Sequence, residues 1–461
     1  MTLNLIAYAA YVPTYRLRPE DIGAAASSAG RVVASFDEDS TTMAVEAASA
    51  ALSAVPDGVV EAVYLATSSP AYADKTNAVA VHAALGLAAD AFCVDIGGTG
   101  RSATAALRVA SQSGGLAVMS DVRVGRPGSA DEKSGGDGAA AFVFGESADD
   151  AAGVAAVVAT ASATTEFLDR WRVPSAATAE QWEERYGQEK YAALIADVQA
   201  RALAQAGIDV PDHVVLTSPN SGIRRRAESF ASCTVSTMIS PIGFTGAADA
   251  GVALAAVLDT AEPGQSILVL SAVDGCDAMV LRVLPGIVDR RPPRSVAQQL
   301  ESAYQVPYTT YLSWRGLLER ELPRRPEPDR PAAPPSGRAV QWKFGFVGAR
   351  CRRCEFVHLP PARVCRGCGS VDDMAPYPVR SRLGTVVTST VDRLAFSPSP
   401  PVVEAVVDFD GGGRCTLEVA DGAAATVSVG SRVEVTFRRL FTAGGVHNYF
   451  WKARPVPKEN V

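Results

Sequence analysis

The chain has 461 residues, 48% of them hydrophobic and 20% charged, and a formal net charge of −7. This length predicts about three domains, and this composition excludes a largely disordered protein. No run of about 18 apolar residues is present, and residues 1–16 lack the pattern of a secretion signal, so we expect a cytoplasmic protein that does not enter a membrane.

From Val340 onward the charge sums to +5, against −12 for the rest. A basic C-terminal part suits a phosphate-bearing ligand or an acidic protein surface, but uneven solvated charge explains it equally well.

The first informative local pattern is a strand, a glycine-rich turn and a helix. Residues 91–96 are apolar and rich in β-formers, which predicts a buried strand, and residues 101–110 follow the turn as a helix. Such an elbow presents one side chain at a helix N-terminus, where the dipole lowers a thiol pKa and backbone N–H groups hold an oxyanion. Here the tip of the elbow is Gly100, which has no side chain.

Residues 1–285 alternate helical and strand patterns, which indicates a layered α/β fold. A helix, a glycine-containing turn, a strand, an Asp-Gly pair and a second strand occur at 105–144 and again about 150 residues later. This offset predicts a duplicated half-domain, with chance similarity of two α/β units as the alternative. We place the halves at about 1–160 and 207–285, with a charged, helical insertion at about 165–206.

The C-terminal third has a different composition. Six prolines predict a stiff linker over 322–339, and short alternating strands predict a small β-barrel over 377–461. Residues 340–376 carry two Cys-x2-Cys pairs, formed by Cys351, Cys354, Cys365 and Cys368. Four thiolates at this spacing close a tetrahedral shell, which predicts a structural zinc ion, whereas disulfides are disfavoured in a cytoplasmic chain. We predict that the remaining cysteines, Cys93, Cys233, Cys276 and Cys415, are buried small apolar residues and not nucleophiles.

The segments 69–75, 135–142, 218–220, 243–258 and 308–318 occur around this elbow in an order that resembles the thiolase superfamily, most closely the archaeal type of 3-hydroxy-3-methylglutaryl-CoA synthase. Residues 340–457 resemble the zinc-ribbon and OB-fold proteins that accompany thiolases. The resemblance implies a five-layer α/β fold of two βαβαβαββ halves over 1–321, followed by a rubredoxin-like zinc ribbon and a small OB-fold barrel.

The resemblance also implies a catalytic set of three residues: a cysteine that takes the acyl group, a histidine and a glutamate. In this sequence these positions fall on Gly100, Thr217 and Ser68. Without a thiolate at the elbow no acyl-enzyme can form there. We therefore expect an acyl-CoA-binding, nucleophile-lacking subunit with a built-in zinc/OB module. The family further implies a homodimer through the thiolase-like domain, and a separate thiolase subunit with which this chain acts in acyl transfer or C–C bond formation.

A glycine at the elbow leaves room for a CoA thioester. Candidates to hold its carbonyl or a phosphate lie at the start of the helix: Gly98, Thr99, Arg101 and Ser102. Three consecutive arginines could meet the CoA phosphates, or could simply lie on a solvent-facing loop: Arg224, Arg225 and Arg226.

Three alternatives stay open at this stage. The first is a thiolase-like aldolase or lyase that acts on a CoA thioester without covalent acylation, with Tyr72, Thr217 and Asn220 as polar residues of the pocket. The second is a dinucleotide-binding oxidoreductase, because Gly98-x-Gly100-x2-Ala103 imitates the dinucleotide fingerprint and Asp121 follows about 20 residues later.

The third alternative is nucleic-acid binding by the basic OB unit through its aromatic residues. We favour a role for these residues in the barrel core or a protein interface, and so expect no nucleic acid. They are Trp342, Phe344, Tyr449, Phe450 and Trp451.

Overall fold

The computed structural model describes residues 3–23, 31–56, 58–146, 153–230, 235–236, 242–301, 303–321, 324–421 and 427–456. The chain forms two compact units. The first comprises Met1–Ala34, Asp39–Val79 and Leu87–Tyr311, and the second comprises Ser35–Glu38, Ala80–Gly86 and Leu312–Val461. Within the described ranges, no helix combines the length and the hydropathy that a membrane span requires. Cys233 lies outside the described residues.

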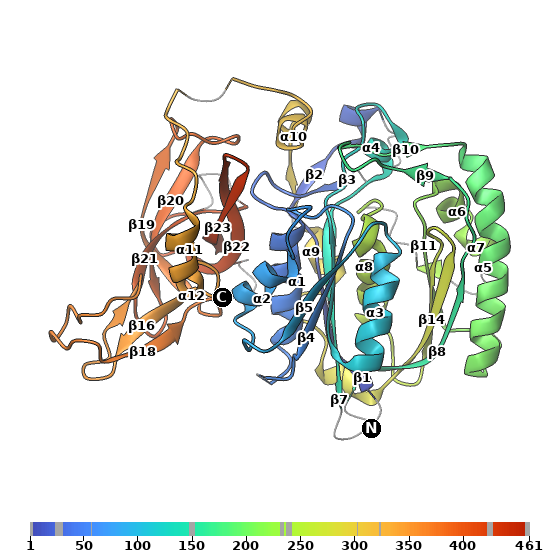
Figure 1. Cartoon of the computed structure of the whole chain (residues 1–461), viewed down its shortest axis with the longest axis horizontal. Coiled ribbons are helices and arrows are strands. Elements are labelled where there is room, and N and C mark those ends of the chain that lie inside the picture. Colours follow the sequence, from blue (N-terminus) through green and yellow to red (C-terminus); the bar gives the residue numbers. More distant parts are fainter. Residues whose placement is uncertain are drawn as a thin grey trace. The chain divides into compact units, whose positions relative to one another are not determined.

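The first unit is built on a ten-stranded mixed sheet (Figure 1). In spatial order its strands are β12 (Val235–Ser236), β11 (His213–Thr217), β13 (Ser266–Ser271), β14 (Cys276–Val283), β8 (Ala155–Ala163), β1 (Leu3–Tyr11), β7 (Gly138–Glu146), β6 (Gly115–Asp121), β4 (Ala62–Thr67) and β5 (Phe92–Gly97).

The two halves of this sheet repeat the same topology. β4 pairs in parallel with β5 and β6, and β11 pairs in parallel with β12 and β13. Toward the middle of the sheet the pairing is antiparallel in both halves: β6 with β7 and β7 with β1 in the first, and β13 with β14 and β14 with β8 in the second. The halves meet where Leu5 pairs with Ala155. This topology confirms the predicted duplication.

Four helices complete the five layers. They are α1 (Ser40–Leu52), α3 (Ser102–Ser113), α5 (Glu184–Ala206) and α8 (Asp249–Leu258). Helix α1 packs on β1 and β7, and α5 packs on β8 and β14 in the same way. Helices α3 and α8 contact each other between the two halves of the sheet, as Figure 1 shows. The predicted thiolase-like layering is therefore present.

Two boundaries differ from the sequence-based expectation. Strand β8 belongs to the second half, which therefore begins before residue 160. Residues 165–206 are not all an insertion, because α5 is the outer helix of the second half, equivalent to α1 in the first. Its buried stripe includes Tyr191, Ile195 and Val198, whose spacing marks one apolar helix face. The charged face of α5 masked this stripe in the sequence.

The remaining elements of the first unit are short. One small sheet contains β2 (Tyr15–Leu17), β3 (Arg31–Val33) and β15 (Tyr304–Gln305), and another contains β9 (Arg170–Trp171) and β10 (Glu180–Gln181). The 3-10 helices are η1 (Pro19–Ile22), η3 (Gly246–Ala248) and η4 (Pro285–Asp289). The short α-helices are α2 (Ala78–Leu85), α4 (Ala130–Ser134), α6 (Ser221–Arg225), α7 (Ala227–Phe230), α9 (Val296–Glu301) and α10 (Tyr308–Trp314), and both α2 and α10 extend into the second unit.

The second unit contains a three-stranded ribbon and a five-stranded barrel, as predicted. The ribbon has the order β17 (Val357–His358), β16 (Val347–Cys351), β18 (Met374–Pro378). The barrel has the order β21 (Arg414–Glu418), β20 (Val402–Phe409), β19 (Gly384–Asp392), β22 (Arg432–Ala443), β23 (Val446–Pro455), and a bridge between Val419 and Ala453 closes it.

The predicted linker over 322–339 is partly helical. Helices α11 (Ala333–Arg338) and α12 (Val340–Lys343) follow a stretch without regular structure. Pro334 and Pro335 stand in the first turn of α11, where a missing N–H costs nothing because those groups have no partner within a helix. Pro326, Pro328 and Pro331 lie in the stretch without regular structure, as expected of a linker, whereas Pro334 and Pro335 start a helix.

The barrel core is aromatic. The side chains of Phe346, Phe437, Tyr449 and Trp451 are buried, and the Trp451 indole N–H donates to the carbonyl of Phe344 at 2.7 Å. The rings of Phe437 and Tyr449 stack with centroids 5.5 Å apart. Tyr449 and Trp451 are thus core residues, as favoured, and cannot stack with nucleic-acid bases.

Two cations are also buried in the second unit. The Lys452 ammonium lies 2.9 Å from Asp37 and 2.7 Å from Glu418, and its side chain is 2% exposed. Arg438 forms ion pairs with Glu38 and Asp421. The residues Asp37 and Glu38 come from the short segment Ser35–Glu38, which therefore supplies counter-ions to the interior of this unit.

Candidate functional site

The elbow between β5 and α3 is present, and its tip has room for a side chain. Gly98 has a φ of +114°, a conformation that favours glycine, whereas Gly100 lies outside that region. A Cβ atom at Gly100 would lie 3.4 Å from the Gly246 carbonyl oxygen and 3.6 Å from Val273 Cγ2, which are ordinary contacts. The fold therefore does not require glycine at position 100.

The strand before the elbow is not buried as predicted. β5 forms the outer edge of the sheet, and all of its residues are exposed or half-buried, with 60% of Phe92 exposed. An apolar run in an edge strand looks like a buried strand in the sequence, because the pattern does not show how many neighbours the strand has.

The structure brings the three family positions together around one segment, residues 245–249. Gly100 lies against Gly246, as described above. The Thr217 hydroxyl donates a hydrogen bond to the Asp249 carboxylate. Ser68 reaches the same segment through Asp121, whose carboxylate accepts from the Ser68 hydroxyl and from the N–H of Ala247, at 2.6 and 2.7 Å.

Asp121 is the centre of this arrangement. It is fully buried, and one carboxylate oxygen accepts from the Ser68 N–H at 2.7 Å and from the Thr67 hydroxyl at 2.9 Å. The same oxygen accepts from the N–H and the hydroxyl of Ser69 at 3.1 and 3.0 Å. With six donors on its two oxygens, Asp121 cannot bind a ribose. The dinucleotide alternative therefore loses its acidic residue.

Asp249 is a functional candidate that sequence reasoning missed. It begins α8, is half-buried, and accepts from the Thr245 N–H at 3.0 Å in addition to Thr217. Burial raises the pKa of the Asp249 carboxyl, against the opposing effects of the Thr217 hydrogen bond and the Arg224 charge. A buried carboxyl with a raised pKa is a suitable group for exchanging a proton with a ligand. No local sequence pattern marks it, because Thr217 and Asp249 lie 32 residues apart.

The polar side chains at the start of α3 hold the fold, so a ligand there would have to bind the backbone N–H groups, which are the groups predicted to hold it. Arg101 forms a two-pronged ion pair with Asp277, at 2.8 and 3.1 Å, and donates to the Asp274 carbonyl at 2.7 Å. The hydrogen bond to Asp277 raises the pKa of Arg101. The Ser102 hydroxyl donates to the Thr99 carbonyl at 2.7 Å. Arg101 thus connects the two halves of the first unit.

The three consecutive arginines do not form one patch. Arg224 is 4% exposed and donates to the Ser218 carbonyl, so it does not lie on a solvent-facing loop. Arg225 pairs with Glu184 at 2.7 Å near the surface, and Arg226 is exposed.

The two polar candidates Tyr72 and Asn220 have different environments. Asn220 is fully buried and caps α6, accepting from the N–H groups of Gly222 and Ile223 at 3.0 and 3.2 Å. Its amide donates to the Glu184 carbonyl at 2.9 Å, so both ends of its side chain serve the fold. Tyr72 is half-buried, and its backbone N–H donates to Asn77 Oδ1 at 3.0 Å.

The four cysteines of the ribbon fit a zinc ion. Their sulfur atoms all lie within 4.8 Å of one another. The Cys351–Cys368 and Cys354–Cys365 sulfur pairs are 3.7 and 3.4 Å apart, close to the roughly 3.8 Å that tetrahedral Zn–S bonds of about 2.3 Å give. His358 is buried beside them and packs against Phe356, with ring centroids 4.9 Å apart. Of the other described cysteines, Cys276 is buried as predicted, whereas Cys93 and Cys415 are only half-buried.

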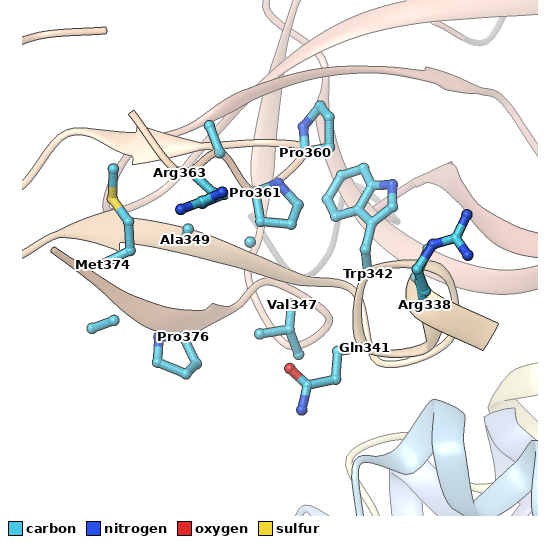
Figure 2. Close-up of a pocket in the computed structure, with 14 residues that line it drawn as sticks. Arg338, Gln341, Trp342, Val347, Ala349, Pro360, Pro361, Arg363, Met374 and Pro376 are labelled. Carbon is cyan, nitrogen blue, oxygen red and sulfur yellow. The ribbon is translucent and has the colours of Figure 1, made fainter. Parts of the chain in front are cut away.

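A separate groove of about 580 Å³ lies beside the ribbon (Figure 2). Its lining is mainly apolar, with Trp342 from α12 opposite Pro360 and Pro361, and Arg338 and Arg363 add charge. None of the residues predicted to form the site lines this groove.

Comparisons with known proteins agree with this architecture. Residues 345–373 match the ChsH2 rubredoxin-like zinc ribbon domain, and residues 378–438 match the ChsH2 C-terminal OB-fold domain. The chain is 29% identical over 346 residues to the hydroxymethylglutaryl-CoA synthase of Archaeoglobus fulgidus, covering 69% of this chain and 99% of that protein. It is 30% identical over 345 residues to that of Methanothermobacter thermautotrophicus, covering 68% and 99%.

A solved structure, MvaS in complex with 3-hydroxy-3-methylglutaryl coenzyme A, superposes with a TM-score of 0.58 at 19% identity, covering 72% of this chain and 94% of MvaS. At this identity the likeness concerns the fold alone. The zinc ribbon match and the four clustered sulfurs together support zinc binding by the second unit.

Proposed function

Because the chain belongs to the hydroxymethylglutaryl-CoA synthase family and carries ChsH2-type zinc ribbon and OB-fold domains, we propose that it binds an acyl-CoA thioester at the elbow without forming an acyl-enzyme. The observation that carries the proposal is Gly100. A side chain would fit there, yet none is present, and the positions beside it hold Ser68 and Thr217 in place of an acid and a base.

Mass spectrometry of the intact protein tests this proposal. After incubation with acetyl-CoA, the wild-type chain is expected to show no added acyl mass, and a stoichiometric adduct would overturn the proposal. The variant Gly100→Cys is expected to gain a hydroxylamine-sensitive acetyl group, because the thiol would stand at the N-terminus of α3. Gly100→Ser, of nearly the same size, is the matched control and is expected to stay unmodified.

We further propose that a separate thiolase subunit supplies the missing nucleophile, and that the assembly carries out acyl transfer or C–C bond formation. The fused zinc ribbon and OB-fold support this proposal, because they add a docking module to the chain. Turnover that appears only when this chain and a co-purifying thiolase are mixed is the expected result. Turnover by this chain alone would contradict it.

The pair of Thr217 and Asp249 favours a second candidate, a lyase or aldolase that works in this chain without covalent acylation. An ionised Asp249 would take a proton from the carbon next to the thioester carbonyl and return it from solvent. In heavy water, the chain alone would then exchange deuterium into acetyl-CoA, and Asp249→Asn would abolish the exchange. Asp259→Asn is the control, because Asp259 is bound to Tyr8 and Val296 elsewhere in the first unit.

The exposed edge of β5 supports the proposal that the first unit forms a homodimer. Phe92 is 60% exposed on β5, which pairs with no strand on its outer side among the described residues, and both features favour pairing with another strand. Size-exclusion chromatography with light scattering is expected to give a dimer for the wild type and a monomer for Phe92→Glu. A wild-type monomer would contradict this proposal.

We also propose that the zinc is structural and that the protein works in the cytoplasm. Four protein sulfurs fill a tetrahedral shell and leave no position for a reactive water. None of the cysteines in the described ranges forms a disulfide, which suits a reducing compartment.

A further inference from the structure

The groove beside the zinc ribbon belongs entirely to the second unit (Figure 2). It is lined by residues of α11, α12, β16 and β18 and of the loop that follows β17. Its largest apolar side chains are one tryptophan, one methionine and three prolines: Trp342, Met374, Pro360, Pro361 and Pro376. A volume of about 580 Å³ lies within the range of about 300–1,000 Å³ that ligand sites occupy. The groove can therefore hold a short peptide segment.

Trp342 is held in place but is not covered. Its ring packs against Phe346 and Phe450, with centroids 5.2 and 5.3 Å away, and the residue is half-buried. The indole N–H of Trp451 donates to a backbone carbonyl, whereas that of Trp342 donates to no group in the described part of the chain. Trp342 therefore presents a fixed aromatic ring and an unused hydrogen-bond donor.

The polar side chains of the groove are mostly donors. Besides the Trp342 N–H they are the Gln341 amide and the guanidinium groups of Arg338 and Arg363, and no Asp or Glu lines the groove. Arg363 is already paired with Asp372, at 2.7 and 2.6 Å. Arg338 is exposed, and no carboxylate oxygen of the described residues lies within 4.0 Å of it. The groove therefore suits a ligand that is rich in acceptors and carries a negative charge.

Proline-rich segments match this lining. A proline has a carbonyl oxygen but no N–H, so a run of prolines brings acceptors into the groove and almost no donors. An ordinary extended peptide would bring one N–H per residue to a groove whose side chains offer only the Gln341 oxygen as a strong acceptor. Proline-rich segments also adopt the polyproline II helix without a partner, so they lose little conformational entropy when they bind an aromatic groove.

We propose that this groove docks a proline-rich segment of another protein, in which a Glu or Asp lies next to the prolines and pairs with Arg338. The prolines would pack between Trp342 and Pro360–Pro361, and the Trp342 N–H would donate to one of their carbonyls. This interaction surface does not depend on acyl-CoA binding at the elbow. It gives the second unit a recognition role in addition to zinc binding.

The chain itself contains a stretch of this composition, Pro326-Glu327-Pro328-Asp329, but none of these residues lines the groove. Arg330, which follows the stretch, lies against the turn between β22 and β23, where a Cβ atom at Gly444 would be 3.0 Å from Arg330 Cδ. Its place beside this turn leaves the groove to a segment of another chain.

Fluorescence anisotropy with labelled peptides and the full-length, zinc-loaded chain tests the proposal. The acidic probe is an octapeptide of six prolines and two glutamates. Two matched peptides replace either the glutamates by lysines or the prolines by alanines. Wild-type protein is expected to bind the acidic probe at least tenfold more tightly than either matched peptide, because one loses the ion pair with Arg338 and the other loses the preformed helix.

Two variants locate the binding. Trp342→Ala is expected to weaken binding of the acidic probe at least tenfold, and Trp182→Ala, which removes a 64% exposed tryptophan of the first unit, is the control without effect. Arg338→Glu is expected to reverse the charge preference, so that the lysine peptide binds more tightly than the acidic probe. Arg185→Glu, at a side chain that is 89% exposed on α5, is expected to keep the wild-type preference. Because Arg338 is exposed, its variant reports on recognition even if Trp342→Ala disturbs the packing around Phe346.

Several results would overturn the inference. Equal binding of the acidic probe and either matched peptide, or no binding at all, would remove the proposed chemistry. An unchanged charge preference in Arg338→Glu would place the binding elsewhere. Displacement of the probe by CoA or by a single-stranded oligonucleotide would make the groove a nucleotide site. Tighter binding of a peptide of residues 324–332 than of the probe, with self-association of the chain, would make a second copy the occupant.

Discussion

Replacing Asp121 with asparagine removes the charge that holds the site together. Its carboxylate accepts six hydrogen bonds, from Thr67, Ser68, Ser69 and Ala247. Asparagine offers one acceptor oxygen and one NH2 group in the same space. The amide retains most hydrogen bonds when its oxygen takes the place of Asp121 Oδ1, which accepts four of the six. Its NH2 group then faces the Ser68 hydroxyl and the Ala247 N–H.

The size of the effect follows from this geometry. The Ser68 hydroxyl can turn and accept from the new NH2 group, but the Ala247 N–H cannot. Losing a hydrogen bond to a charged group costs about 1.5–3 kcal/mol, and a buried unsatisfied N–H adds about 1–3 kcal/mol. We therefore expect Asp121→Asn to lower the free energy of unfolding by about 4 kcal/mol. For a unit of this size that corresponds to a fall in Tm of about 8–16 °C.

Urea unfolding and differential scanning calorimetry measure this loss, with Asp212→Asn as the control. Asp212 accepts two hydrogen bonds from Ser266, but it is exposed, so we expect that variant to lose only about 1 kcal/mol. Equal losses in the two variants, or a loss below about 1 kcal/mol in Asp121→Asn, would refute the assignment of Asp121 as the organising residue. Acyl-CoA binding is also expected to fall in Asp121→Asn, because Ser68 and the segment 245–249 lose their common anchor.

Three further predictions concern charge and metal. Burial raises the pKa of Asp249, so its contribution to stability is complete below the unfolded pKa of about 3.9 and is lost as pH rises through the folded value. Asp249→Asn should therefore raise Tm at pH 8 and have little effect near pH 3.5, and a lower Tm at pH 8 would contradict this. Lys452→Met should cost about 3–5 kcal/mol in thermal unfolding by leaving Asp37 without its cation, and adding Asp37→Leu should restore most of the loss. Chelation or Cys354→Ser should reduce the zinc content from one per chain to zero and unfold the ribbon, as followed by metal analysis and NMR.

The local features of this protein could be predicted from the sequence. The Cys-x2-Cys pairs specify their own geometry, because each pair lies within one turn and needs no distant partner to be identified. The elbow around Gly100 was likewise visible as a strand, glycines and a helix within 20 residues. The same holds for the duplication, since the order of its elements repeats along the chain.

The electrostatic features could not be predicted, because they depend on residues from distant segments. Asp249 becomes notable only when Thr217 lies beside it, and Asp121 becomes notable only when Ser68 and Ala247 both donate to it. Helix α5 was misassigned for a related reason. Most of its residues are polar or charged and exposed, so the apolar stripe that packs on the sheet is not obvious from the sequence. The burial of that stripe in the structure identifies it.

The buried ion pairs of the second unit bear on how this gene could be divided. Lys452 and Arg438 depend on Asp37 and Glu38, which the ribosome makes some 400 residues earlier. A fragment that starts in the proline-rich stretch would contain both cations but neither of these acids. The second unit is thus completed by a segment near the N-terminus, and a C-terminal fragment expressed alone would have to bind that segment again before its buried cations were paired.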